Sequence, residues 1–130
     1  MKKIKLIILG IISFTYFQAC KGQSAIELQQ IYSTEIVGTW SEEEDPLHKL
    51  EFTNNGIFRI YYDAELIDTM TYSITFSCGE QTTTNQSLFL TFQDADGTFC
   101  QFLEAVNKDN SNMLSMTDMS GHLQIYNKVN

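Results

Sequence analysis

Three cysteines are the residues of this 130-residue chain whose chemistry the sequence constrains most. The first, Cys20, follows an apolar run from Leu6 to Phe17, and three lysines lie within the first five residues. A basic start, a short apolar stretch and a small residue such as Ala19 near the cleavage point form the layout of a secretory signal. The apolar run of twelve residues is shorter than the roughly 20 that a transmembrane helix needs. We therefore expect the chain to be exported.

The segment Phe17-Gln18-Ala19-Cys20 resembles a lipobox, the cleavage signal of bacterial lipoproteins. The resemblance implies cleavage before Cys20 and acylation of its thiol and amine. Several acyl chains would anchor the protein to a membrane, because a single chain binds only marginally. Lys21 fits sorting to the outer membrane, so we expect an outer-membrane lipoprotein of the bacterial cell envelope, periplasmic or surface-exposed. The alternative is an ordinary signal peptide, cleaved near Ala19 or after Gly22 without lipid.

Cys78 and Cys100 remain as a pair if Cys20 carries lipid. An exported protein meets an oxidising environment, which favours a disulfide between them. Their bond would close a loop of about 22 residues, which the chain-entropy account values at roughly 3 kcal/mol. Two free buried thiols are the alternative.

The other reactive residues form no recognisable catalytic or metal-binding pattern. His48 and His122 are the only histidines, whereas a zinc site needs three or four ligands, often in closely spaced pairs. The acidic run at positions 42–45 and the turn Asp94-Ala95-Asp96-Gly97 lack the converging oxygens that calcium requires. The sequence has neither a Gly-x-Ser-x-Gly elbow nor a glycine-rich phosphate loop. We expect no enzymatic activity, no metal and no cofactor.

The charge balance restricts the class of partner. Sixteen acidic residues against eight Lys and Arg give a formal net charge of −8 and a pI near 4.5. All sixteen acids follow Cys20 and three of the basic residues precede it, so a chain cut before Cys20 carries −11. Such a chain repels phosphate groups, and we expect no nucleic-acid partner. The 43% hydrophobic content and the length are typical of one globular domain.

Strands must position these residues, because from residue 35 onward the apolar pattern alternates with period two. A short helix is expected before them at residues 24–32, where Ser24 and Glu27 have the spacing of a capping box. Eight strands are expected, at residues 36–41, 49–53, 57–63, 70–77, 88–93, 98–106, 113–117 and 122–129, with a polar loop at 79–87.

Eight such strands with short connections close most naturally into an up-and-down antiparallel barrel, which leaves no exposed edge. A two-sheet sandwich is the alternative. The expected organisation is a lipoprotein signal peptide at 1–19, a tether and short helix at 20–34, and an all-β barrel domain at 35–130.

Gly38-Thr39-Trp40 opens the first predicted strand and resembles the Gly-x-Trp signature of lipocalins. The stretches Phe52–Gly56 and Tyr72–Ile74 are similar to small lipocalin-like lipoproteins of the Bacteroidetes. The resemblance covers about residues 35–129 and implies a lipocalin-like barrel with Trp40 across its closed end. The Thr-Asp-Tyr turn and the late arginine of lipocalins are not visible, since Arg59 is the only arginine. The architecture is therefore carried over, but a lipocalin ligand is not.

An eight-stranded barrel either fills with side chains or holds one small ligand. The candidate core or ligand-binding residues are apolar and expected to face inward: Trp40, Phe52, Phe58, Ile60, Tyr62, Tyr72, Phe92 and, beside them, Ile74, Leu90, Leu103 and Ile125. Residues 98–106 are apolar on both faces, which predicts a covered or partner-binding patch.

Two functions are consistent with this sequence. The first is a lipid-anchored, lipocalin-like binding protein that holds a small apolar ligand in the barrel mouth. The second is a periplasmic interaction or inhibitor protein, or an envelope assembly protein, with a filled barrel. A cavity of about 300 Å³ or more favours the first, and a filled interior favours the second.

Overall fold

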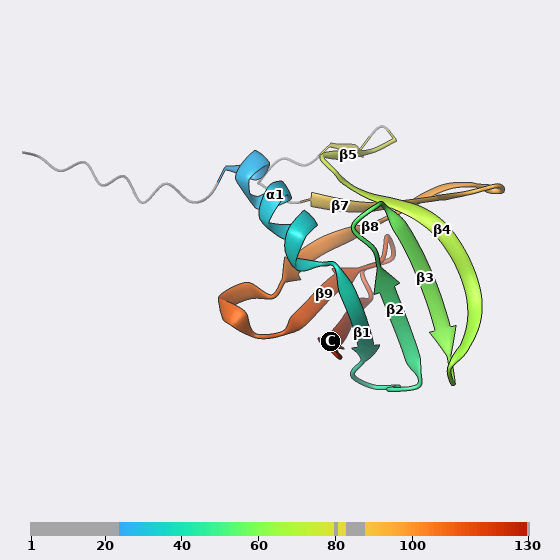
Figure 1. Ribbon diagram of the computed structural model, residues 1–130. Helices are drawn as coiled ribbons and strands as arrows, with labels where there is room; N and C mark the ends of the chain where they lie inside the picture. The colour runs from blue at the N-terminus through green and yellow to red at the C-terminus, as the bar shows by residue number, and fades with distance from the viewer. Residues whose placement is uncertain (1–23, 80, 83–87, 130) are drawn as a thin grey trace, which may run out of the picture.

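The computed structural model of the chain describes residues 24–79, 81–82 and 88–129. The expected signal peptide and Cys20 lie outside the described residues. One α-helix, α1 (Ala25–Glu35), precedes a run of strands that curve around a common interior (Figure 1). The chain is therefore mostly β, as its alternating pattern predicts.

Eight strands form a closed antiparallel barrel in the order β1-β10-β9-β8-β7-β4-β3-β2. Consecutive barrel strands pair with one another, and β10 pairs with β1 to close the ring, which confirms the up-and-down barrel and excludes the sandwich. The barrel strands are β1 (Gly38–Glu42), β2 (His48–Phe52), β3 (Ile57–Tyr62), β4 (Glu65–Thr75), β7 (Leu88–Asp94), β8 (Gly97–Val106), β9 (Met113–Thr117) and β10 (Leu123–Lys128).

Helix α1 begins as its sequence predicts and packs at one end of the barrel. The Ser24 hydroxyl accepts a hydrogen bond from the Glu27 backbone N–H at 3.2 Å, which caps the first turn. The buried Tyr32 joins the barrel core, and the Gln29 side-chain amide donates to the Ile74 carbonyl at 2.7 Å. The helix ends three residues later than expected, at Glu35, and Ile36 is fully buried behind it.

Aromatic side chains pack against one another through the barrel interior. Trp40 is fully buried, and its indole N–H donates to the Ile36 carbonyl at 2.8 Å. The ring of Phe58 lies 4.8 Å from that of Phe52 and 4.5 Å from that of Phe92. Burial of each such side chain stabilises the fold by roughly 1.5–3 kcal/mol. The barrel interior is thus largely a packed core.

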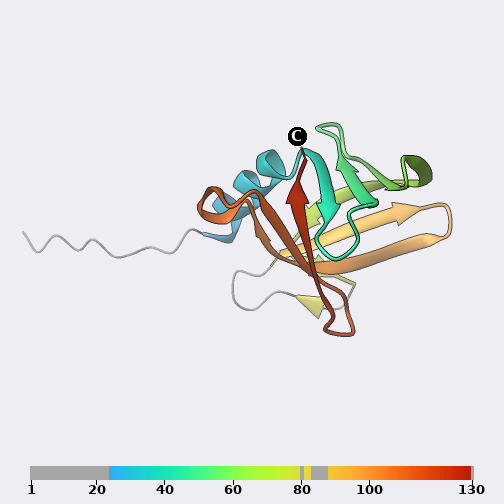
Figure 2. The same ribbon diagram turned by 90° about the horizontal axis from the view of Figure 1, so that it is seen from below.

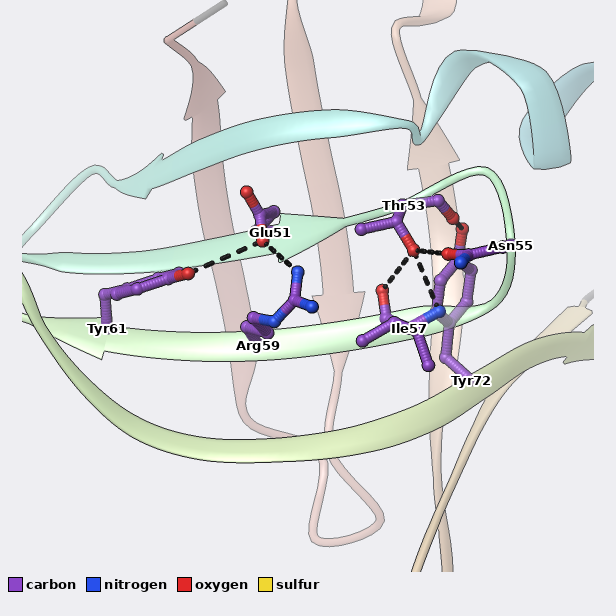
Figure 3. Close-up of polar contacts among 7 residues, drawn as sticks. All are labelled: Glu51, Thr53, Asn55, Ile57, Arg59, Tyr61 and Tyr72. Atoms are coloured by element: carbon purple, nitrogen blue, oxygen red, sulfur yellow. Dashed lines mark hydrogen bonds and ion pairs between the residues drawn. The ribbon is translucent and has the colours of Figure 1, made fainter.

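The predicted Asn-Asn-Gly turn joins β2 to β3 and is held by side-chain hydrogen bonds (Figure 3). The Thr53 hydroxyl contacts the Asn55 side chain and accepts from the Ile57 backbone N–H at 3.0 Å. Tyr72 of β4 donates its hydroxyl proton to the Thr53 carbonyl at 2.6 Å. Gly56 has φ +82°, a conformation that glycine adopts without strain. The turn therefore fixes the register of three strands together.

A bulge in β8 explains why both faces of this strand are apolar. The register with β9 shifts between Leu103 and Ala105, so Leu103 and Val106 both face the core. An extra residue in one strand changes which face the following side chains reach. Phe102 instead faces outward, where its ring lies 4.9 Å from that of Phe89. Phe89 is only 1% exposed, so this outer patch is covered.

A short hairpin of β5 (Ser77–Cys78) and β6 (Gln81–Thr82) lies outside the barrel, next to β7. Its Cys78 reaches Cys100 of β8, and their sulfur atoms lie 2.09 Å apart, which is disulfide-bonding distance. The predicted cysteine pair is therefore brought together. The sequence predicted only a polar loop after Cys78, and two weakly β-forming dipeptides gave no pattern from which to infer a hairpin.

Candidate functional site

The two ends of the barrel differ in construction. At one end α1 packs against β4 and β8. The opposite end, which we call the mouth, consists of the connections at residues 43–47, 63–64, 95–96 and 118–122 and the strand residues next to them. Figure 2 shows α1 on one side of the barrel and the β3–β4 and β7–β8 turns on the other.

The mouth leads into a small chamber of about 120 Å³. Its apolar walls come from strands β2, β3, β7, β8 and β9 and consist of Leu50, Phe58, Ile60, Phe92, Phe99 and Met116. Its polar residues come from β2, β8 and β10 and are His48, Gln101, Gln124 and Tyr126. The chamber is thus lined by apolar and aromatic side chains and by four polar side chains.

An ionisable pair lies beside the chamber. His48 Nδ1 lies 2.7 Å from a carboxylate oxygen of Glu42, and both side chains are about one quarter exposed. Tyr126 is buried next to them, with its ring centre 6.0 Å from that of His48. Burial and the charge of Glu42 raise the pKa of the Tyr126 phenol above its ordinary value. Tyr126 therefore stays neutral and keeps its hydroxyl proton at physiological pH.

Gln101 provides a polar group without a partner. The residue is partly exposed, but its side-chain Oε1 is buried and accepts no hydrogen bond from another described residue, alone among the buried side-chain nitrogen and oxygen atoms of the described residues. Leaving a buried acceptor unsatisfied costs about 1–3 kcal/mol. Because Gln101 lines the chamber, a hydrogen-bond donor that entered the chamber could bond to this oxygen.

Apolar side chains are exposed mainly around the mouth. Of the eleven large apolar side chains that are exposed within the described ranges, seven lie in or next to the mouth connections. These seven, the mouth rim, are Leu47, Tyr62, Leu66, Ile67, Phe99, Met119 and Leu123, each at least 44% exposed. Single exposed apolar residues are ordinary, but such a concentration at one end marks an interaction surface.

Acidic residues gather at the same end. Nine of the sixteen acids lie in or beside the mouth connections: Glu42, Glu43, Glu44, Asp45, Asp63, Glu65, Asp94, Asp96 and Asp118. None of the four connections contains Lys or Arg, and His122 lies 3.8 Å from Asp118. The Ser120 hydroxyl, followed by backbone N–H donors of the 118–122 turn, lowers the pKa of Asp118, which therefore stays charged. The mouth is both apolar and strongly negative.

The predicted ligand-binding residues separate into three groups. Phe58, Ile60 and Phe92 line the chamber. Trp40, Phe52 and Tyr72 instead pack in the barrel half nearest α1, where Phe52 meets Tyr72 edge-on at 5.0 Å. Tyr62 belongs to the mouth rim and is 45% exposed.

Sequence reasoning missed the polar half of the chamber. It expected Ile125 to face inward, whereas Tyr126 is the buried residue of that pair and pairs with Leu114 of the core. Because Ile125 and Tyr126 both have large apolar side chains, alternation did not show which face of β10 points inward. Gln101 lies on the same face of β8 as Phe99 and Leu103. A prediction that this face points into the barrel would therefore also have placed the Gln101 amide inside.

A second hollow, of about 550 Å³, lies between α1 and the β8–β9 connection at the other end. The Asn107 side-chain amide donates to a Glu35 carboxylate oxygen at 2.8 Å across it. Four residues of this connection have φ between +48° and +57°, which Asn and Asp adopt more readily than most residues: Asn107, Asp109, Asn110 and Asn112. These contacts make the hollow a seam that joins the helix to the barrel.

Among the described residues, no group of three His, Cys, Asp or Glu side chains is arranged to hold a metal ion. Within residues 24–79, 81–82 and 88–129, no helix has the length and apolar content required to cross a membrane.

Comparison with family models, curated proteins and solved structures finds no match to this chain. Its function therefore has to be inferred from the geometry of the mouth.

Proposed function

We propose that this protein is an exported, lipid-anchored envelope protein whose filled barrel binds a partner protein through its mouth. The observation that carries the proposal is the contrast between a packed interior and an apolar mouth rim. Among the described residues, sixteen buried apolar side chains form one core cluster, and Trp40, Leu90 and Leu114 within it have no exposed surface. The barrel thus acts as a rigid support for the rim.

The volume of the chamber favours a protein partner over an enclosed ligand. Ligand pockets generally measure about 300–1,000 Å³, and the chamber measures about 120 Å³. The rim, by contrast, extends over all four mouth connections. Aromatic and methionine side chains such as Phe99, Tyr62 and Met119 are the types enriched in protein interfaces.

The position of the proposed anchor is compatible with this use of the mouth. Lipidation at Cys20 lies four residues before Ser24, which caps α1. Because α1 packs at the end opposite the mouth, an anchor there would direct the mouth away from the bilayer. The acidic mouth would also be repelled by anionic headgroups. These features support a location in the cell envelope, with the barrel facing the periplasm or the cell exterior.

A small apolar ligand in the mouth is the second candidate, and the chamber supports it. Six apolar side chains and an unpartnered amide oxygen would suit a compact molecule with one donor group. The closed eight-stranded meander, with Gly38-Thr39-Trp40 as the first residues of its first strand, supports a lipocalin-like relationship. No catalytic activity forms part of either candidate.

Native mass spectrometry of protein purified from its host separates the two candidates. We expect a co-purified protein with the wild type and with Ile26→Ser, which alters an exposed residue of α1. The double variant Leu47→Ser/Leu123→Ser should lose that protein at unchanged thermal stability. A co-purified lipid that the double variant also loses would favour the ligand candidate and contradict the protein partner.

The anchor has its own test. Replacement Cys20→Ser should move the protein from the membrane fraction to the soluble fraction. A protein that stays membrane-bound after this change would contradict the lipid anchor.

A further inference from the structure

We infer that the mouth recognises a basic polypeptide and that the chamber receives the tip of one of its lysine or arginine side chains. The inference rests on the proposed function and adds the chemistry of the partner. Three observations carry it: the charge of the mouth, the unpartnered acceptor in the chamber, and the shape of the aromatic walls.

The charge of the mouth selects a cationic partner. Nine acidic residues surround the rim, and the four connections contain neither Lys nor Arg. Like charges that meet across an interface are strongly unfavourable, so complementary charge sets partner choice and association rate. A second copy placed mouth to mouth would oppose two acidic ends, and an anionic membrane surface would be repelled in the same way. A basic polypeptide meets no such repulsion.

The chamber supplies acceptors for a donor-rich group. Gln101 Oε1 is buried without a partner, and the Glu42 carboxylate lies beside the chamber in contact with His48. Lysine carries three donors and arginine five, and neither carries an acceptor. Insertion of either group would satisfy Gln101 and place a positive charge near Glu42.

The walls of the chamber suit a cation as well as an alkyl stem. The rings of Phe92 and Phe99 stack at 5.2 Å, and Phe58 lies 4.5 Å from Phe92. Aromatic faces attract ammonium and guanidinium groups, and apolar walls accommodate the methylene stem of these side chains. A volume of about 120 Å³ admits one such group and leaves the rest of the partner on the rim. Leu47, Leu123 and Phe99 would then contact the apolar surface around the inserted residue.

Fluorescence anisotropy with two peptide probes tests the inference on the purified full-length protein. One probe is a labelled twelve-residue peptide of lysine, leucine and glycine, and the other has glutamate in place of lysine. The lysine probe should bind the wild type at least about tenfold more tightly. Salt should weaken that binding, because screening reduces attraction between exposed charges.

Matched variants separate recognition by the mouth from attraction to net charge. Glu43→Gln/Glu44→Gln/Asp96→Asn removes three charges from the mouth, and Glu27→Gln/Glu104→Gln/Asp109→Asn removes three charges elsewhere. We expect the first triple variant to weaken the lysine probe about tenfold and the second to leave it within twofold. Equal weakening by both, or no preference for the lysine probe, overturns the inference.

The chamber has a separate variant and control. Gln101→Met removes the acceptor at similar size and should weaken the lysine probe about tenfold, whereas Gln93→Met on the exposed face of β7 should not. Unchanged binding by Gln101→Met overturns the insertion of a side chain. Thermal melts of each variant show that the barrel still folds. The co-purification experiment tells the two failures apart, since a neutral or acidic protein captured at the mouth contradicts only this inference.

Discussion

At the scale of single residues, Trp40 connects the helix to the barrel. It is fully buried, and its indole N–H donates to the carbonyl of Ile36, the residue that caps α1. The side chain therefore contributes both packing and a buried hydrogen bond.

Replacement of Trp40 should separate these two contributions. Trp40→Ala is expected to lower the free energy of unfolding by about 3–5 kcal/mol, as large-to-small changes in cores do. Trp40→Phe keeps an aromatic ring but leaves the Ile36 carbonyl unpaired, so a smaller loss of about 1–3 kcal/mol is expected. Urea denaturation followed by circular dichroism measures both. Equal stability of Trp40→Phe and the wild type would show that the hydrogen bond contributes nothing.

The sequence pattern predicted the burial of the aromatic residues better than it predicted the polar residues of the chamber. Phe92 lies between Thr91 and Gln93, and Phe58 shares its strand face with Ile60, so alternation placed both inside. Gln101 and His48 are polar residues on inward positions, which contradicts the usual rule that polar side chains face solvent. Only the folded barrel shows that His48 of β2 and Gln101 of β8 line the same chamber.

At the scale of elements, the β5–β6 hairpin is attached to the outer face of the barrel through Cys78 and Cys100. It lies next to β7, whose Phe89 is almost completely buried although it faces outward. The cysteine pair therefore ties the hairpin to the outer face of the barrel, beside β7.

Removal of this cross-link should cost stability without opening the barrel. We expect Cys78→Ser/Cys100→Ser to lose roughly 3 kcal/mol, the chain-entropy value for a loop of this length. Alkylation with and without reductant, followed by mass spectrometry, should first show the bond in the wild type. Free thiols in the unreduced wild type, or a double variant of undiminished stability, would contradict this account of the hairpin.

Periodicity predicted the strands well where one face is buried, and poorly where both faces are exposed or where a bulge interrupts the pairing. The eight barrel strands follow from alternation, although β4 begins five residues earlier than expected. Its extra residues include Leu66 and Ile67, adjacent exposed apolar residues that no alternating pattern accommodates. The bulge in β8 likewise has no signature in the sequence, because it depends on pairing with β9.

At the scale of the whole molecule, buried phenols link stability to alkaline pH. Burial raises the pKa of Tyr32, Tyr72 and Tyr126 above the ordinary value, and for Tyr126 the charge of Glu42 adds to the shift. In the unfolded chain these phenols ionise near pH 10, while in the folded barrel they remain neutral. The stability they provide is complete below pH 10 and declines as pH rises beyond it.

Denaturation at pH 8 to 12 should therefore show a falling free energy of unfolding above pH 10. Tyr126→Phe should make that decline shallower, because phenylalanine has no proton to lose. A decline of the same slope in Tyr126→Phe and the wild type would place the pH dependence elsewhere.

The asymmetry between the two ends is the property that the sequence alone least reveals. Acids and exposed apolar residues are scattered along the chain, from Glu42 to Leu123. The antiparallel meander brings every second connection to the same end, so they converge on the mouth. The barrel interior is filled, and exposed apolar residues and acidic residues gather at one end. We assign binding to that end for these two reasons.

Site-specific photo-crosslinking in living host cells tests this central claim most directly. A benzoylphenylalanine residue is introduced at Leu123 in the mouth rim or at Ile26 on α1, both exposed positions. Irradiation should produce a defined protein adduct from position 123 and none from position 26. Equal adducts from both positions, or an adduct from position 26 alone, would contradict the assignment of the mouth as the binding end.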